Sequence, residues 1–323
     1  MNLKNKSILQ IMIITLMIIM NMMINNKMFM WMTLEISTMS FISMMIMSKS
    51  YTPSILYFII SFISSTMMML GLMVNQTMNM NILIIMSIMI KIAMFPFNYW
   101  FNLMSKSINY MNMSIMMTMM KFIPMNIMHM TIELNQFTML MIMASMMISP
   151  IMTINKYSMK LILSYSSIHQ TSLMMMIMYM NFYMFITYFI LYTIITVSMM
   201  NMFNKMSSKT KYEFIMNKKM KTMLFITMIM YSYFPPMATF IMKWSIIENM
   251  IMMNNQFKLI SLIVVMSSFI MIWSYLNFMN NNIYKYNNFN KMFMKSSKTK
   301  LQSPLFTMWI ITVSSTTYMY INF

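Results

Sequence analysis

The sequence predicts an all-α polytopic membrane protein with about eleven transmembrane helices. Of the 323 residues, 60% are hydrophobic and only 8% are charged, whereas soluble domains carry about 25% charged residues. A chain so poor in charge cannot cover a surface that faces water. Its 22 lysines outnumber four glutamates, but they separate long hydrophobic runs and form no basic face on a soluble body. This distribution argues against nucleic acid as a partner.

Eleven hydrophobic runs are long enough to cross the roughly 30 Å of hydrocarbon in a bilayer. In chain order they cover about 7–24, 28–47, 53–74, 79–97, 111–131, 135–153, 157–179, 182–202, 222–248, 256–278 and 303–321. The longer polar connections, 203–221 and 279–302, are too short to form separate domains. We therefore expect residues 1–323 to form a single transmembrane domain.

The positions of the lysines support this count. If the N-terminus faces the inside, the inside connections hold sixteen lysines, the outside connections hold only Lys27, and five lysines lie within the runs. A missed or extra helix would destroy this alternation. The positive-inside rule therefore favours eleven spans, with the two termini on opposite sides of the membrane.

The residue bias indicates where the gene resides. The chain has 66 methionines but one glycine, Gly71, and no cysteine. The abundant residues have A/T-rich codons, and so many methionines are easiest to explain if AUA is read as Met, as in many animal mitochondria. We therefore expect a protein of the mitochondrial inner membrane, with its N-terminus in the matrix and its C-terminus in the intermembrane space.

The small set of metal-binding side chains excludes several respiratory cofactors. Without cysteine there is no thiolate zinc site and no iron–sulfur cluster. Two histidines cannot hold two haems that each need a pair of His ligands. We therefore expect no cofactor in this chain.

Ionisable side chains inside predicted spans are the first candidates for function. The four deepest are Glu35, Lys91, Lys121 and Lys243. A charge at the bilayer centre costs roughly 2.5–3.5 kcal/mol on insertion scales, so such a residue is a functional candidate by default. Lys91 lies about twelve residues, or roughly 18 Å, into its run, and Lys121 lies at a similar depth. By contrast, Lys160 and Lys258 lie near helix ends, from which a long side chain reaches the interface.

Prolines accompany two of these lysines. Pro96 follows Lys91 by five residues, and Pro235–Pro236 precede Lys243 by seven. Proline removes a helix hydrogen bond, and freed backbone groups at membrane depth are tolerated only inside protein or beside a water-filled cavity. We therefore expect broken helices at the fourth and ninth spans.

The spacing of these two broken helices predicts an internal repeat. They lie five helices apart, and a repeat with an odd number of helices inverts the topology. We expect two inverted five-helix repeats, roughly 1–131 and 135–278, followed by a terminal helix at 303–321. Pro124, just beyond Lys121, is expected only to kink its helix.

A glutamate beside a buried lysine can load and unload a proton. At about 6 Å and an effective dielectric constant of about 20, such a pair is worth roughly 3 kcal/mol. Forming or separating the pair therefore changes whether the lysine keeps its proton, and no redox group is needed. His169, in a polar stripe of the seventh helix, is a candidate proton relay, although serines around it are equally typical of packing between helices.

Three strings of the sequence are similar to motifs of one family. Lys91–Trp100 matches Lys-x-Gly-x-x-Pro-Phe-His-x-Trp, Leu161–Ile168 matches an Ala-Tyr-Ser-Ser-Ile helix, and Phe234–Trp244 matches Leu-Pro-Pro-x-x-Gly-Phe-x-Pro-Lys-Trp. Glu35 and Lys121 match the remaining charged positions. The chain resembles the NADH dehydrogenase subunit 2 family, antiporter-like membrane subunits of respiratory complex I in their short animal form.

The sequence departs from the family pattern at several positions. Asn98 replaces the usual His, Met242 replaces a Pro, and Ser232–Tyr233 stand where the family has Gly-Gly. His169 lies one residue before the family's histidine, which turns its side chain by about 100° on a helix.

The resemblance implies a role for each charged residue. Glu35 would pair with Lys91, Lys121 would be the connecting lysine, and Lys243 the terminal one. NAD, FMN, iron–sulfur clusters and ubiquinone would be handled by other subunits. The implied partners are those membrane subunits of complex I and the membrane lipids.

Two other functions remain open at this point. A stand-alone cation/proton antiporter shares the architecture and the charged helices. Alternatively, the chain is a structural membrane subunit without pumping of its own, whose buried charges only fix helix packing.

The lysine partition predicts that Asn2 faces the matrix and Asn322 faces the intermembrane space. Because the chain has no native cysteine, single cysteines introduced at these two positions can be labelled with a membrane-impermeant reagent from either side. We expect each to react from one side only, and from opposite sides. Reaction of both from the same side would refute the eleven-span topology.

Overall fold

The computed structural model describes residues 3–74, 81–131, 135–156, 158–207, 228, 231, 238–252 and 255–289. Within these ranges every regular element is a helix, which confirms the all-α prediction. The chain divides into two compact units, Met1–Phe189 and Ile190–Phe323.

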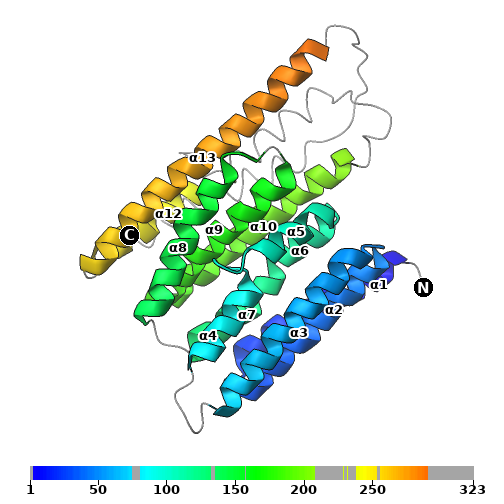
Figure 1. Ribbon diagram of the computed structural model, residues 1–323, viewed down its shortest axis with the longest axis vertical. Helices are drawn as coiled ribbons and strands as arrows, with labels where there is room; N and C mark the ends of the chain where they lie inside the picture. Colours follow the sequence, from blue (N-terminus) through cyan, green and yellow to red (C-terminus); the bar gives the residue numbers. More distant parts are fainter. Residues whose placement is uncertain are drawn as a thin grey trace. The chain divides into compact units, whose positions relative to one another are not determined.

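The first unit holds the lysine-bearing helices of the N-terminal part. Its helices are α1 (Leu3–Met23), α2 (Lys27–Met47), α3 (Tyr51–Val74), α4 (Asn81–Ile92), α5 (Tyr99–Ser107), α6 (Tyr110–Met117), α7 (Met119–Thr131), α8 (Gln136–Thr153), α9 (Met159–Met180) and the start of α10 (Phe182–Ser207). Helices α1, α2 and α3 lie side by side, as Figure 1 shows, and α8 packs along α9. Helix α7 is central because it contacts α1, α2, α4, α6 and α9.

The second unit contains the remainder of α10 together with α12 (Ala238–Met252) and α13 (Asn255–Phe289), which pack against each other. Tyr231 joins them through its ring, which lies 6.3 Å from that of Tyr192 and 5.8 Å from that of Tyr275, measured between centroids. The predicted break at Pro235–Pro236 and the terminal span 303–321 lie outside the described residues.

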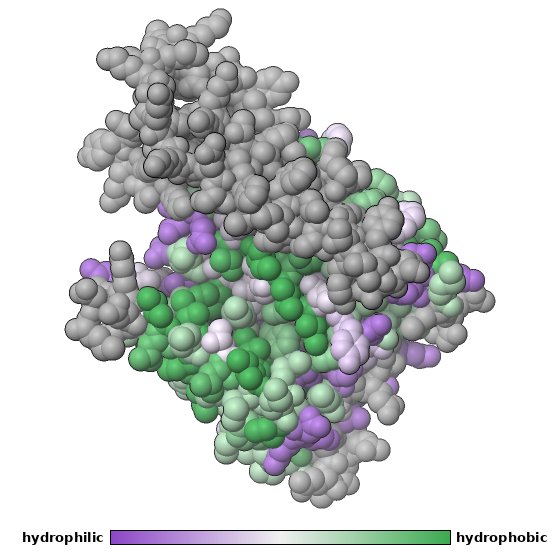
Figure 2. Space-filling view, turned by 180° about the vertical axis from the view of Figure 1, so that it is seen from behind, coloured by the Kyte–Doolittle hydropathy of each residue, from purple (hydrophilic) through white to green (hydrophobic). Residues whose placement is uncertain are grey.

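The helices have the length and surface of membrane spans. Among the residues that the structure describes, five helices are long and apolar enough to cross a bilayer: Lys27–Met47, Tyr51–Val74, Gln136–Thr153, Phe182–Asn204 and Phe257–Phe278. The face in Figure 2 carries a broad area of hydrophobic side chains with hydrophilic residues at its margins. The count of eleven spans and the two inverted repeats stay predictions.

Two predicted spans differ in detail from the observed helices. The run 79–97 is interrupted before Pro96, as expected, because α4 ends at Ile92, but a separate nine-residue helix, α5, follows the interruption. The run 111–131 is also interrupted, at Thr118 between α6 and α7, whereas Pro124 lies inside α7. No proline lies at the break at Thr118, so the sequence does not indicate it.

Helix α2 ends without the glycine that such an end usually contains. The amide of Lys49 donates to the carbonyl of Ile46 over 3.0 Å, and the amide of Ser50 donates to Met45 over 3.1 Å. These two bonds close a Schellman motif, in which a left-handed residue stops the helix. Lys49 occupies that position with φ of 60°.

The single glycine of the chain allows α3 and α4 to approach closely. A Cβ added at Gly71 would lie 2.7 Å from Cγ1 of Ile84 and 3.2 Å from its backbone nitrogen. Real Cβ atoms do not approach neighbours so closely, so the contact requires a residue with no side chain.

We predict that Gly71→Ala destabilises the assembled protein, because overpacking costs about 1–3 kcal/mol. The measurement is the thermal inactivation midpoint, and we expect it to fall by several degrees. In an Ile84→Ala background, which lacks the clashing Cγ1, the same Gly71→Ala change should lower the midpoint by less than it does in the native chain. Thr66→Ala on the exposed side of α3 is the control, and an unchanged midpoint for Gly71→Ala would contradict the steric explanation.

Candidate functional site

The end of α4 lies directly beside Lys91. The amide of Ala93 donates to the carbonyl of Ile90 over 3.2 Å, and the amide of Met94 donates to Met89 over 3.1 Å, which is a second Schellman motif. Ala93 takes the left-handed position with φ of 63°. It stands where the resembled motif has glycine, so the helix break forms although the glycine is absent.

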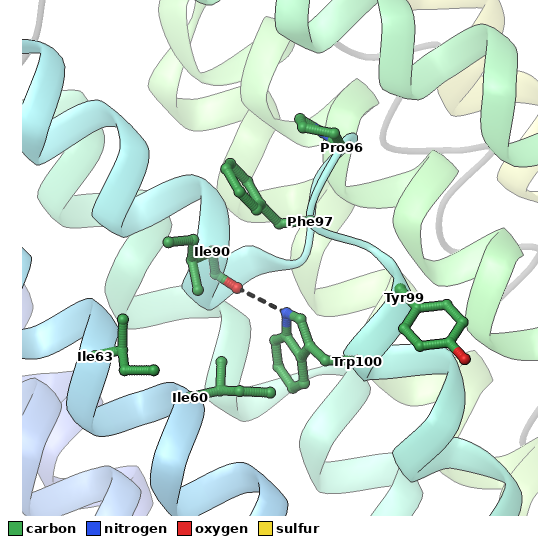
Figure 3. A pocket seen from close by; sticks show the side chains of 7 residues that line it. All are labelled: Ile60, Ile63, Ile90, Pro96, Phe97, Tyr99 and Trp100. Atoms are coloured by element: carbon green, nitrogen blue, oxygen red, sulfur yellow. Dashed lines mark hydrogen bonds between the residues drawn. The ribbon is translucent and has the colours of Figure 1, made fainter.

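The start of α5 is tied back to the end of α4. The indole Nε1 of Trp100 donates to the carbonyl of Ile90 over 3.2 Å, which Figure 3 shows as a dashed line. This bond gives the helix end a side-chain partner where no further turn of helix is available. The hydrogen bond borders an apolar groove of about 360 Å³, lined by Ile60, Ile63, Ile90, Pro96, Phe97, Tyr99 and Trp100.

Glu35 and Lys91 form an ion pair between α2 and α4. The Lys91 Nζ lies 3.5 Å from Oε1 of Glu35, and the exposed fractions of the two side chains are 6% and 22%. Within the described part of the chain this is the one salt bridge. The pairing that the family resemblance implied for these two residues is therefore present in the fold, while their role in proton movement stays a proposal.

Lys121 is buried in surroundings of a different kind. It lies in the first turn of α7 with 2% of its surface exposed. Its Nζ donates to the carbonyl and to the hydroxyl oxygen of Ser167 over 3.4 and 3.3 Å. The ring of Phe101 lies below it, 4.3 Å from Nζ to the centroid. Among the described residues no carboxylate lies within salt-bridge distance of this ammonium.

Helix α9 supplies a buried polar surface beside Lys121. Its buried polar residues are Ser164, Ser166, Ser167, His169, Gln170, Thr171 and Ser172. The hydroxyl of Ser167 donates to the carbonyl of Ser164, and that of Ser164 contacts Oδ1 of Asn102 on α5, each over 2.7 Å. A chain of short polar contacts therefore connects Lys121 through α9 to α5.

His169 lies on this helix two residues beyond Ser167 and is fully buried. Its neighbour Gln170 accepts a hydrogen bond from the phenol of Tyr188 on α10. The geometry is compatible with both alternatives left open by the sequence, a relay and a packing group, so the relay stays a proposal.

Two of the other lysines singled out in the sequence, Lys243 and Lys160, lie in different settings. Lys243 lies on α12 in the second unit and is 3% exposed. Lys160, which the sequence predicted to reach the membrane interface, donates from its Nζ to the carbonyl of Lys106 over 3.2 Å and to that of Ile108 over 2.6 Å. These carbonyls end α5, so Lys160 caps that helix, an arrangement that the helix dipole favours.

Two residues of the site were not found as candidates from the sequence. Trp100 belongs to a matched motif, but its bond to Ile90 depends on the shape of the break. Phe101 is one of 24 phenylalanines, and no sequence pattern distinguishes it. Only the position of α5 reveals either contact.

Comparison with known proteins places the chain in a family. Residues 73–271 match the family model described as NADH:quinone oxidoreductase/Mrp antiporter, TM. The NADH-ubiquinone oxidoreductase chain 2 of Rhipicephalus sanguineus is 30% identical over 305 residues, covering 88% of this chain and 95% of the relative. The chain belongs to the NADH-ubiquinone oxidoreductase chain 2 family. Chain 2 of Apis mellifera ligustica is 26% identical over 308 residues, 93% of this chain and 92% of that one.

Chains of known structure have the same fold as this protein. A chain of respiratory complex I from Thermus thermophilus with bound aureothin has a TM-score of 0.74 at 13% identity, covering 96% of this chain and 76% of that one. A chain of the Mrp complex from Dietzia sp. has a TM-score of 0.70 at 12% identity. That match covers 83% of this chain and 59% of the Mrp chain.

We predict that Ala93→Gly stabilises the protein, because a left-handed residue with a Cβ costs roughly 1–2 kcal/mol and glycine avoids most of this cost. Ala144→Gly provides the matched control. Ala144 lies inside α8, where glycine costs about 1 kcal/mol relative to alanine. The same substitution should therefore raise the thermal inactivation midpoint at one site and lower it at the other. A decrease at both sites would show that Ala93 is not strained.

Proposed function

We propose that this chain is a proton-translocating membrane subunit of respiratory NADH:ubiquinone oxidoreductase in the mitochondrial inner membrane. The observation that carries the proposal is the Glu35–Lys91 ion pair at an interrupted helix in a family of quinone oxidoreductase and antiporter subunits. A second buried lysine, Lys121, lies near the same helix break. The membrane-length helices and the mitochondrial relatives support the localisation.

The redox chemistry belongs to other subunits of the assembly. NADH oxidation and ubiquinone reduction need NAD, FMN, iron–sulfur clusters and a quinone site, and a chain without cysteine cannot bind such clusters through thiolates. This subunit would therefore respond to a conformational or electrostatic signal from neighbouring membrane subunits of complex I, which are its partners together with lipids.

The ion pair provides a means of controlling one proton. At 3.5 Å and an effective dielectric constant of about 20, the attraction between the two charges is about 5 kcal/mol. This is enough to hold the proton on Lys91 while Glu35 is near and to favour its release when the pair separates. Helix α4 ends at Ile92, one residue beyond Lys91, and the flexible lysine side chain can move relative to Glu35.

A released proton needs an acceptor of similar chemistry. In this proposal Lys121 is that acceptor, as a neutral amine that has already passed its own proton on, and its Nζ is surrounded by neutral oxygens and an aromatic ring. Its proton is therefore not fixed by a carboxylate of its own among the residues described. We propose that Lys121 is the connecting site, Lys243 the terminal site, and His169 a relay.

The proposed topology follows from the sequence. It has eleven spans in one transmembrane domain, with inverted five-helix repeats at roughly 1–131 and 135–278 and a terminal helix at 303–321. The N-terminus faces the matrix and the C-terminus the intermembrane space. The interruption between α4 and α5 supports the broken helix of the first repeat.

A stand-alone cation/proton antiporter is the second candidate, because the fold also matches a chain of an Mrp complex. The two proposals differ in their assemblies. Copurification of the native chain with an NADH-oxidising complex supports the first, and its isolation without that activity supports the second.

We predict that Lys91→Met abolishes or strongly reduces proton pumping, because it keeps a long side chain but removes the proton site and leaves Glu35 without its cation. Lys91→Arg should also impair turnover, since arginine hardly releases a proton at accessible pH. The measurement is protons moved per NADH oxidised in sealed vesicles, after confirming assembly. Lys106→Met is the matched control, because the Lys106 side chain is exposed.

Normal rate and stoichiometry in assembled Lys91→Met complex would contradict pumping through this residue. That result would favour the structural alternative, in which the buried charges fix helix packing and volume-matched neutral replacements have no effect on pumping.

A further inference from the structure

Two consecutive residues at the start of α5 contact the surroundings of two different lysines. Trp100 donates to the carbonyl of Ile90, the residue that precedes Lys91 in α4. Phe101 places its ring 4.3 Å from the Nζ of Lys121 in α7. The residue bonded to the helix end beside Lys91 and the residue in contact with Lys121 are therefore joined by one peptide bond.

The contact is extended by further aromatic rings. The ring of Trp100 lies 5.7 Å from that of Phe101, edge to face, and 6.0 Å from that of Tyr57 on α3. The Tyr57 ring lies in turn 5.2 Å from that of Phe41 on α2, the helix that carries Glu35. A packed series of side chains therefore runs from α2, the helix of Glu35, to the ammonium of Lys121.

The rest of α5 is held so that its first turn cannot shift independently. Asn102, the next residue, accepts a hydrogen bond from Ser164 of α9 over 2.7 Å. At the other end of the helix, Lys160 of α9 donates to the last carbonyls. Because α5 has only nine residues and is hydrogen-bonded at both ends, we expect its first turn to move only together with the rest of the helix, as a short connector between α4, α7 and α9.

The contact between Lys121 and the Phe101 ring depends on whether the lysine is protonated. An aromatic face attracts an ammonium, and the attraction is larger when the cation is desolvated, as it is here. A neutral amine is not held in this way. Displacement of the Phe101 ring therefore changes how well the protonated form of Lys121 is stabilised.

We propose that Trp100 and Phe101 are positioning residues that couple the Glu35–Lys91 pair to Lys121 through α5. A movement of the end of α4 pulls on Trp100 and so displaces the ring beneath Lys121. This inference rests on the proposed function, since it concerns the order in which the two lysines exchange their protons.

The alternative to this proposal is that Phe101, which is 1% exposed, only fills space. The two explanations differ in the property of the side chain that matters. Space filling depends on bulk, whereas support of an ammonium depends on an aromatic face. Replacing phenylalanine with another aromatic residue and with an aliphatic residue separates them.

The first experiment measures proton pumping in sealed vesicles that contain assembled complex with Phe101→Leu, Phe101→Tyr or Phe101→Met. We expect the leucine and methionine variants to lose about three- to tenfold in pumping rate and the tyrosine variant to stay within about twofold of the native rate. Phe62→Leu, the same change on the exposed side of α3, is the matched control and should have no effect. Equal rates for all Phe101 variants in assembled complex would overturn the proposal.

A second experiment tests the coupling itself. Trp100→Phe removes the N–H donor but keeps an aromatic ring, so we expect it to slow pumping. If both residues act in one series, the double variant with Phe101→Leu should be no slower than the slower single variant. Multiplication of the two separate losses, or a native rate in Trp100→Phe, would show that α5 does not couple the sites.

A benchmark variant separates failure of this inference from failure of the proposed function. Lys121→Met should stop pumping if Lys121 carries protons. If Lys121→Met stops pumping while the α5 variants are native, the function holds and the coupling is wrong. If Lys121→Met pumps normally, the role of Lys121 is wrong, and the coupling proposal is overturned with it.

Discussion

The structure depends on one constraint, that a helix ending in apolar surroundings must still satisfy its last carbonyl groups. Helix α4 ends at Ile92, and its end is completed by the Schellman bonds at Ala93 and Met94 and by the indole of Trp100. The place of this end determines where Lys91 lies relative to Glu35. The chain that leaves it starts α5, whose first turn lies beside Lys121. Backbone hydrogen bonding thus decides the geometry of the charged groups.

Lys91 and Lys121 show how a membrane protein can bind two ammonium groups with electrostatic interactions of different strength. Lys91 has a full negative charge at 3.5 Å, whereas Lys121 has two oxygens of Ser167 and a ring. Coulombic attraction between full charges in a protein interior exceeds the attraction of an ammonium to a ring or hydroxyl. In the proposed function Lys121 passes its proton on, which the weaker support favours, and Lys91 responds to a signal because its partner charge can be moved.

Much of the fold could be predicted from the sequence because hydropathy reports burial in lipid directly. The interruption after Lys91 was expected from Pro96, whereas the pairing of Glu35 with Lys91 was implied only by the resemblance to the family. Helix α5 was missed because Asn102 and Lys106 interrupt its hydrophobicity and suggest a loop. The break at Thr118 was missed because a backbone turn at a threonine leaves no compositional signal. The count of eleven spans stays a prediction, since 303–321 lies outside the residues described.

The scarcity of glycine has a consequence for how such a gene can drift. At Lys49 and Ala93 the backbone adopts a left-handed conformation with a Cβ present, and the surrounding hydrogen bonds absorb the strain. At Gly71 the obstacle is the volume of a neighbouring helix, and close-packed atoms cannot yield in the same way. A bias against G-rich codons can therefore replace a glycine that is needed only for a left-handed backbone conformation, because the loss of stability at each such site is small. Glycines that serve close packing are the ones that such a bias cannot remove without moving a helix.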